Sequence, residues 1–353
     1  MFRKFFRRLF SQSAIPPYTP PEVDTTKTPA LPHEKGEIPK IRVVFMGTPS
    51  LSATILEALL EKKYNVVGVV TKPDRPAGRK KELTESPVKR IALKNNLPLL
   101  QPEKIDAETT EHIRSWKPDL IVVAAYGKIL PESLLDIPGF GCVNFHPSLL
   151  PKWRGASPIQ NAILSGETET GVTLMLLDKG MDTGDILAQV TVPIEPTDTT
   201  PVLTNKLVER GVELMLTTLP LWIERRITPK KQDESKVTLC QMIERSDGHI
   251  IWTDDAESIY NRYRALSPWP GIYTYWKKKD DLLRLKLTTI SYQKQNPQIT
   301  NPLGTIFEIG EKIGVQTTTG IIFLEEVQLE GKTPLPVQQF LLGNEGFVGS
   351  NLE

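Results

Sequence analysis

A stretch near the middle of the chain contains polar residue types that can take part in catalysis: VNFHPSLLPKWRGASP, from Val143 to Pro158. Asn144 and His146 stand at alternate positions after an apolar run, and the chain has only 4 histidines. Farther along, Asp182 lies in the glycine-containing segment GMDTGD. An amide and an imidazolium can stabilise charge on an attacked carbonyl oxygen, while a carboxylate can orient the imidazole and relay a proton. These three side chains are therefore candidates for acyl transfer.

Ser148 is a competing candidate, as the nucleophile of a serine hydrolase. It lies in HPSLLP rather than in a GxSxG motif, and closeness to His146 in sequence does not establish the hydrogen bond of a triad. Structural roles are also open: Asn144 can cap a turn, His146 can be a buried imidazole and Asp182 can form an Asx turn. Their complementary chemistry favours catalysis without a covalent nucleophile. Arg154 has no assigned role, and could hold the loop together or approach the substrate.

Strands and helices alternate in the part of the chain that would position these residues. Ile41–Pro49 is a β-branched apolar run followed by a helical pattern, and further strand-like runs begin at Asn65 and Pro118. This alternation predicts an α/β fold with a parallel, right-handed sheet covered on both faces. Sites in such sheets form beyond the carboxyl ends of the strands. The strand GCVNFH would bring Asn144 and His146 to that edge.

Neither a dinucleotide nor a metal is predicted. The first turn, MGTPSLS, has the single glycine Gly47 where a dinucleotide-binding turn has GxGxxG, so we interpret Gly47 as allowing a tight turn. The histidines have no HExxH or CxxC companions. The 2 cysteines are far apart, which argues against a disulfide framework.

The length of the chain indicates two domains, and its net charge gives no overall positive potential that would attract nucleic acid. The chain has 353 residues, of which 39% are hydrophobic and 24% charged, and its formal net charge is +1. No apolar run is long enough to span a membrane, so stable membrane insertion is not expected. The patterns predict a disordered basic and proline-rich extension over residues 1–40, a catalytic domain over 41–224, a linker over 225–245 and a small β domain over 246–353.

Several segments resemble the folate-dependent formyltransferases. NFHPSLLPKWRGASPIQNAI and TGVTLMLLDKGMDTGDIL are similar to the signature of that family. TKPDRPAGRKKELTESPVK, VVAAYGKILP and LSPWPGIYTYW resemble its branch that acts on initiator tRNA, and the resemblance runs from about Ile41 to the end of the chain. It implies a Rossmann-like, parallel-sheet formyltransferase domain without a dinucleotide, followed by a small OB-like β-barrel domain that binds tRNA.

The resemblance also implies roles for individual residues. The implied reaction transfers the formyl group of 10-formyltetrahydrofolate to the α-amino group of methionyl initiator tRNA, with no metal. The implied catalytic residues are Asn144, His146 and Asp182. The implied folate contacts are Ser148, Leu149, Leu150, Pro151, Ile129 and Leu130. The implied tRNA contacts are Arg75, Arg79, Lys80 and Lys81, whose positive charges could meet phosphates.

Two other functions share part of this pattern. A formyltransferase acting on a small amine, such as a sugar nucleotide or glycinamide ribotide, would keep the catalytic residues but would not explain the PDRPAGR loop. A non-catalytic RNA-binding protein would not explain why all three catalytic types are present. We expect a monomer in the cytoplasm, or in the mitochondrial matrix if residues 1–15 act as a presequence.

Overall fold

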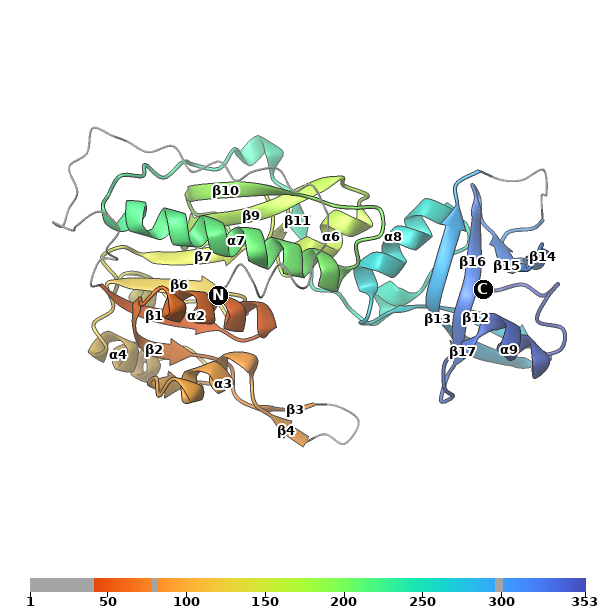
Figure 1. Cartoon of the computed structure of the whole chain (residues 1–353), viewed down its shortest axis with the longest axis horizontal. Helices are drawn as coiled ribbons and strands as arrows, with labels where there is room; N and C mark the ends of the chain where they lie inside the picture. Colours follow the sequence, from red (N-terminus) through yellow and green to blue (C-terminus); the bar gives the residue numbers. More distant parts are fainter. Residues whose placement is uncertain (1–40, 78–81, 296–300) are drawn as a thin grey trace. The chain divides into compact units, whose positions relative to one another are not determined.

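The structure is a computed structural model that describes residues 41–77, 82–295 and 301–353 (Figure 1). The predicted extension over residues 1–40 lies outside the described residues. The chain divides into two compact units. The first comprises the described residues up to Arg154, Glu169–Pro193 and Asn205–Thr238, and the second comprises Gly155–Thr168, Ile194–Thr204 and Leu239–Glu353. The predicted linker has residues in both units, so the domain limits read from the sequence stay a prediction.

A seven-stranded sheet in the order β10-β9-β7-β6-β1-β2-β5 forms the centre of the first unit. From β7 to β5 neighbouring strands run parallel, whereas β9 and β10 are antiparallel additions next to β7. The strands are β1 (Arg42–Gly47), β2 (Asn65–Val70), β5 (Leu99–Leu100), β6 (Leu120–Ala124), β7 (Cys142–His146), β9 (Glu169–Leu176) and β10 (Ile186–Pro193). The predicted α/β class is confirmed.

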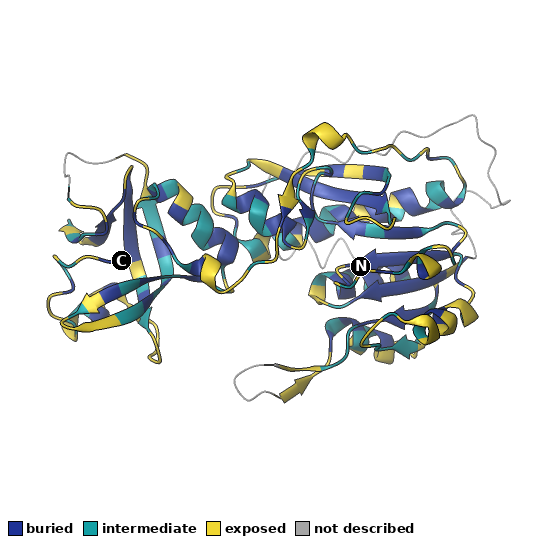
Figure 2. Ribbon diagram, turned by 180° about the vertical axis from the view of Figure 1, so that it is seen from behind, coloured by how far each residue is buried: buried dark blue, intermediate teal, exposed yellow. Residues whose placement is uncertain are grey.

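The central strands of the sheet are buried (Figure 2). Helices cover the sheet because these strands carry apolar side chains on both faces. On one face, Val44 and Met46 of β1 belong to a buried cluster with Ile113 and Leu134 from two helices. The long helix α7 packs closely on the other face: a Cβ at Gly211 would lie 2.2 Å from the ring of Phe145 in β7. The helices are α2 (Ser50–Glu61), α3 (Pro87–Lys94), α4 (Ala107–Ser115), α5 (Glu132–Leu135) and α7 (Thr200–Ile223).

The turn between β1 and α2 is tight for a steric reason. A Cβ at Gly47 would lie 2.8 Å from the backbone oxygen of Ala124 and 2.6 Å from the Cβ of Ser52. Ser52 also donates a hydrogen bond from its hydroxyl to Ala124 O at 2.6 Å. Gly47 therefore allows the helix to begin against the neighbouring strand, as the sequence predicted.

The second unit contains an antiparallel sheet in the order β12-β13-β16-β15-β14, with β17 paired to β16. This curled sheet is the predicted OB-like domain. Its core centres on Trp276, which meets the rings of Phe347 and Phe340 edge-on at 5.0 and 6.1 Å. The elements are β12 (Ile272–Lys278), β13 (Asp281–Gln293), β14 (Ile306–Ile309), β15 (Lys312–Gln316), β16 (Ile321–Leu329), β17 (Leu335–Pro336), α8 (Ala256–Leu266) and α9 (Val337–Leu342).

Short elements complete the described chain. They are the hairpin of β3 (Arg75–Ala77) and β4 (Glu82–Thr84), the pair β8 (Arg154–Gly155) and β11 (Leu239–Cys240), the helix α6 (Pro158–Leu164), and the 3₁₀ turns η1 (Glu234–Lys236) and η2 (Ser246–Gly248). Among the helices that the structure describes, none combines the length and the apolar character that a bilayer crossing requires.

Candidate active site

Strand β7 carries two of the three candidate catalytic residues on one face of the sheet. Because successive side chains of a strand point to opposite faces, Asn144 and His146 point the same way. Asn144 is half-buried and His146 is buried. Nε2 of His146 lies 3.0 Å from the backbone oxygen of Trp153. Since a carbonyl oxygen only accepts, Nε2 is the nitrogen that carries a hydrogen.

The other ring nitrogen of His146 faces Asp182. Nδ1 lies 3.6 Å from Oδ1 of Asp182, and both side chains are largely shielded from solvent. Burial lowers the pKa of His146 below its usual value of 6.5, while the Asp182 charge and the bond to Trp153 oppose that shift. The net shift favours the neutral form of His146. In the neutral ring the unprotonated nitrogen is Nδ1, so of the two ring nitrogens Nδ1 is the one that can accept a proton.

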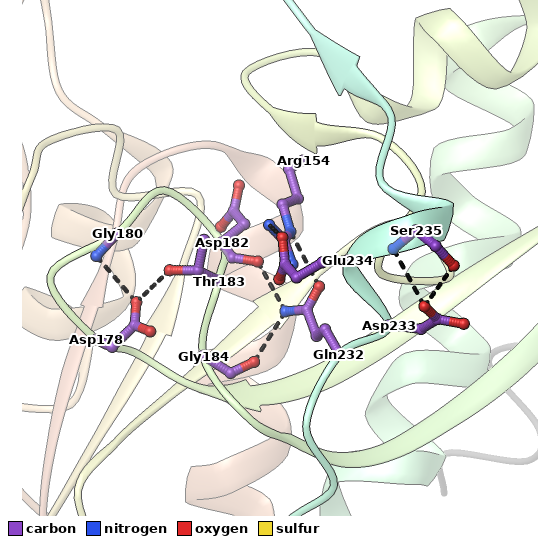
Figure 3. Close-up of polar contacts among 10 residues, drawn as sticks. All are labelled: Arg154, Asp178, Gly180, Asp182, Thr183, Gly184, Gln232, Asp233, Glu234 and Ser235. Carbon is purple, nitrogen blue, oxygen red and sulfur yellow. Dashed lines mark hydrogen bonds and ion pairs between the residues drawn. The ribbon is translucent and has the colours of Figure 1, made fainter.

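Asp182 lies in the loop that connects β9 to β10 (Figure 3). Its φ is 54°, a left-handed conformation that Asp tolerates better than most residues. Earlier in the loop, Oδ1 of Asp178 accepts hydrogen bonds from Gly180 N at 3.0 Å and from Thr183 Oγ1 at 2.7 Å. A Cβ at Gly184 would lie 1.8 Å from a backbone oxygen of β9. The loop is thus folded tightly against the end of the strand.

The turn that follows His146 engages the hydroxyl of Ser148. This side chain is 0% exposed, and its Oγ donates to the backbone oxygen of Lys152 at 2.6 Å. Ser148 therefore holds the turn together, and the structure gives no support to the serine-hydrolase alternative. Among its neighbours, Leu149 and Pro151 are half-buried and Leu150 is buried.

Two polar residues that the sequence reasoning missed fix this turn to the antiparallel strands. Thr173 accepts from Leu150 N at 3.0 Å and donates to Ser148 O at 2.7 Å. Gln189 donates to Leu150 O and to Thr173 Oγ1, each at 2.8 Å. The sequence signal for Thr173 is a polar residue inside the apolar run of β9, and the structure shows that its side chain is 0% exposed.

The other two candidate folate contacts, Ile129 and Leu130, follow β6. Ile129 is 91% exposed. Leu130 is buried and belongs to the core cluster that includes Tyr126 and Leu134. Of the pair, Ile129 presents its side chain to the surface, and Leu130 anchors the segment.

Of the four candidate tRNA contacts, Arg75 lies on β3, which pairs with β4 in a hairpin. Arg75 is exposed and forms an ion pair with Glu103, with 2.7 Å between Nη2 and Oε2. Arg79, Lys80 and Lys81 lie outside the described residues. The structure thus places one of these four cations, on an exposed hairpin.

The two cysteines and the metal-ligating residue types form no second reactive centre in the described part of the chain. Cys142 and Cys240 are buried and are not joined in a disulfide. Burial raises the pKa of the Cys142 thiol to about 12, so the nucleophilic thiolate is disfavoured. Within residues 41–77, 82–295 and 301–353, no three His, Cys, Asp or Glu side chains gather as a metal site would require.

Solved structures share the fold. An N-formyltransferase from Helicobacter canadensis, solved with folinic acid and dTDP-3-aminofucose, aligns with a TM-score of 0.60 at 20% identity, covering 80% of this chain and 98% of that one. HypX from Aquifex aeolicus, in complex with tetrahydrofolic acid, aligns with a TM-score of 0.59 at 19% identity, covering 88% of this chain and 49% of that one. At such identities the likeness concerns the fold alone.

Sequence comparisons are more specific. Residues 40–219 match the formyl transferase family and residues 242–345 match the formyl transferase C-terminal domain. A methionyl-tRNA formyltransferase of Geotalea daltonii is 41% identical over 314 residues, which is 88% of this chain and 98% of the relative. One of Geobacillus sp. is 45% identical over 316 residues, 86% of this chain and 94% of the relative. With both domains matched in order along nearly whole relatives, the chain belongs to the methionyl-tRNA formyltransferase family.

Proposed function

We propose that this chain transfers the formyl group of 10-formyltetrahydrofolate to the α-amino group of methionyl initiator tRNA, giving formylmethionyl-tRNA for translation initiation. One observation carries the proposal: Nδ1 of His146, at the end of β7, faces Oδ1 of Asp182 at 3.6 Å, with Asn144 on the same side of the strand. The Ser148 hydroxyl and the Cys142 thiol are buried, which supports direct attack by the amine rather than a covalent intermediate on the chain.

Each of the three residues has a distinct task in this mechanism. The amine of the methionyl group attacks the formyl carbon, and negative charge develops on the formyl oxygen. The Asn144 amide donates a hydrogen bond to that oxygen. Nδ1 of His146 accepts the proton that the amine loses, directly or through water, and the Asp182 carboxylate stabilises the resulting imidazolium. The proton then passes to the tetrahydrofolate nitrogen that leaves.

The folate co-substrate supplies the formyl group, and the segments next to the catalytic residues fit a ligand with an apolar ring system. Leu149, Pro151 and Ile129 combine apolar side chains with partial or full exposure beside the edge of the sheet. We propose these three as direct contacts. Ser148, Leu150 and Leu130 are buried and would act by fixing the backbone of the two segments.

The proposed tRNA contacts are the four cations Arg75, Arg79, Lys80 and Lys81. Basic side chains that are close together in sequence can bind phosphates without reading the bases, and such contacts weaken as salt releases counterions. Arg75 is exposed enough to exchange Glu103 for a phosphate. The antiparallel domain, matched at residues 242–345, is proposed as the second tRNA-binding part.

A single assay tests the function. The purified chain is incubated with 10-formyltetrahydrofolate and methionyl initiator tRNA, and formylmethionine is measured after release from the tRNA. Formylation of methionyl-tRNA is the expected result. Tight tRNA binding without product would indicate a non-catalytic RNA-binding protein. Formylation of amino sugars but not of methionyl-tRNA would indicate the branch with small acceptors.

Location and assembly belong to the same proposal. We place the enzyme in the cytoplasm and treat it as a monomer, because the relatives named above come from bacteria and the three catalytic residues come from one chain. Mass spectrometry of the mature N-terminus separates this from cleavage of a presequence near residue 15. Light scattering of the purified protein measures the assembly, and a mass near 39.6 kDa is expected.

A further inference from the structure

The loop that carries Asp182 has to reach back along its own sheet. Strand β9 runs antiparallel to β7, so its last residue, Leu176, pairs with Val143, whereas His146 pairs with Thr173. At about 3.4 Å per residue, β9 therefore ends about 10 Å past the level of His146, towards the N-terminal end of β7. Strand geometry alone therefore does not bring Asp182 next to His146. Some other contact must hold the returning part of the loop.

Gln232 makes that contact from a segment that the sequence predicted to be a linker. Its Nε2 donates to the backbone oxygens of Asp182 and Gly184, each at 2.8 Å (Figure 3). The two carbonyls lie on either side of Thr183. Both amide hydrogens of Gln232 are therefore used to fix the backbone immediately around the carboxylate.

Arg154 sets the orientation of the Gln232 amide. Its Nε donates to Oε1 of Gln232 at 3.0 Å, so the oxygen of the amide points to the guanidinium and the nitrogen points to the loop. The rest of the guanidinium donates two hydrogen bonds to Glu234, from Nη1 to Oε2 at 3.2 Å and from Nη2 to Oε1 at 2.7 Å. The Arg154 side chain is only 5% exposed, and Glu234 compensates its charge.

We propose that Gln232, oriented by Arg154, is a positioning residue that holds the carboxylate of Asp182 against His146. Gln232, Arg154 and Glu234 together are called the Gln232 clamp below. The inference rests on the proposed function, in which Asp182 stabilises the imidazolium, and it gives Arg154 the role that the sequence left open. None of the three clamp residues needs to touch substrate.

Kinetics of Gln232→Met provide the first test, because methionine is of similar length and has no hydrogen-bond donor. Loss of the two loop contacts is expected to lower kcat about 10- to 100-fold, with KM for folate and tRNA changed less than about twofold. Ser235→Ala is the matched control, since the bonds of Ser235 go to Asp233 in the same turn (Figure 3). That variant should keep the wild-type kcat.

A second readout follows the pKa of His146 by NMR of labelled histidine, in four proteins: wild type, Gln232→Met, Asp182→Asn and the double variant. If the clamp acts through the charge of Asp182, Gln232→Met shifts the His146 pKa when Asp182 is present and leaves it unchanged in the Asp182→Asn background. This readout needs no turnover. It therefore decides the clamp even if the wild-type chain fails to formylate methionyl-tRNA, a result that would overturn the proposed function instead.

Two results would overturn the clamp. The first is a wild-type kcat in Gln232→Met. The second is a His146 pKa shift on Gln232→Met that is equally large in the wild-type and Asp182→Asn backgrounds. That result would mean that the substitution only loosens the surroundings of His146. Arg154→Lys gives an independent check, because lysine keeps the charge but lacks Nε and the planar guanidinium. We expect Arg154→Lys to lower kcat as much as Gln232→Met does, and the double variant to lower it no further.

Discussion

Nδ1 of His146 and Oδ1 of Asp182 lie 3.6 Å apart, too far for a good hydrogen bond but close enough for the carboxylate to stabilise a positive charge when the ring is protonated. The opposite nitrogen of the ring is held by the backbone oxygen of Trp153 at 3.0 Å. The ring is thus fixed from one side and influenced electrostatically from the other. This arrangement suits a base that is neutral before the reaction and becomes charged during it.

Asp182→Asn should abolish most of the activity. The substitution keeps the shape of the side chain and removes the charge that stabilises protonated His146, so kcat should fall at least about 100-fold. The pKa of His146 should fall further below 6.5, because the opposing effect of Asp182 is lost. Binding of tRNA, measured by filter retention, should be almost unchanged. A kcat within a few-fold of wild type would contradict the role given to Asp182.

The pH profile of kcat should follow His146 on its acidic side. Protonated Nδ1 cannot accept a proton from the amine, so kcat declines as pH falls. Because burial lowers the pKa of His146, the decline should be centred below pH 6.5, with a plateau at neutral pH. Rates in single turnover, which exclude product release, measure this profile. An acidic limb centred above pH 6.5 would be inconsistent with a buried neutral histidine.

The same shift affects stability. The folded pKa of His146 is below the unfolded value, so the unfolded chain binds the proton more readily between the two. The contribution of neutral His146 to the free energy of unfolding is fully present above the unfolded pKa of about 6.5. It is lost as the pH falls through that value towards the folded pKa. Urea unfolding at several pH values should show a smaller pH dependence in His146→Gln than in wild type.

Thr173→Val should destabilise the turn after β7. Valine matches threonine in shape but leaves Leu150 N and Ser148 O without the partner that Thr173 provides, which should cost about 1–3 kcal/mol of unfolding free energy. Urea unfolding measures this loss. Thr173→Ser keeps the hydroxyl and should recover most of the stability, so equal losses in the two variants would mean that packing rather than hydrogen bonding is responsible.

Gly184→Ala should displace the Asp182 loop. The new methyl group would lie 1.8 Å from a backbone oxygen of β9, a clash that the side chains cannot relieve. We expect kcat to fall about 10-fold or more through misplacement of Asp182. Gly139→Ala is the control, because a Cβ at Gly139 meets nothing within 4 Å. Equal activity of the two variants would show that the loop tolerates movement.

Arg79→Ala should weaken the use of tRNA rather than the chemistry. Loss of one phosphate contact should raise KM for methionyl-tRNA and reduce the slope of log affinity against log salt by about 1. The KM for folate should be unchanged. Arg114→Ala removes an exposed cation of α4 that pairs with Glu111. It is expected to alter neither quantity, and an unchanged salt slope in Arg79→Ala would remove the loop from the tRNA contacts.

The sequence was sufficient where side-chain type decides the structure. The apolar runs predicted the strands of the parallel sheet, and the run GCVNFH predicted the strand whose end carries Asn144 and His146. The pairing of His146 with Asp182 was also foreseen from chemical complementarity, and the two side chains do approach each other. Turn geometry at Gly47 followed from the need for a small residue beside the sheet.

Contacts that involve backbone groups or long separations could not be predicted. The partner of His146 Nε2 is the carbonyl of Trp153, and every residue type carries a carbonyl. Gln232 lies in a polar, proline-containing stretch that looks like a spacer, and it meets Asp182 from 50 positions away. No periodicity encodes such a contact, because it depends on where two irregular segments lie once the sheet has formed.

The clamp has a consequence for the order in which the protein matures. During synthesis from the N-terminus, the chain contains Asn144, His146 and Asp182 well before Gln232 and Glu234 emerge. Contacts between distant residues form late, because they require closure of long loops. A nascent chain that ends near residue 225 would therefore carry the full set of reactive side chains without the contact that aims the carboxylate. Until Gln232 and Glu234 had emerged and docked, its formyl transfer step would stay about 10- to 100-fold slower than in the finished protein.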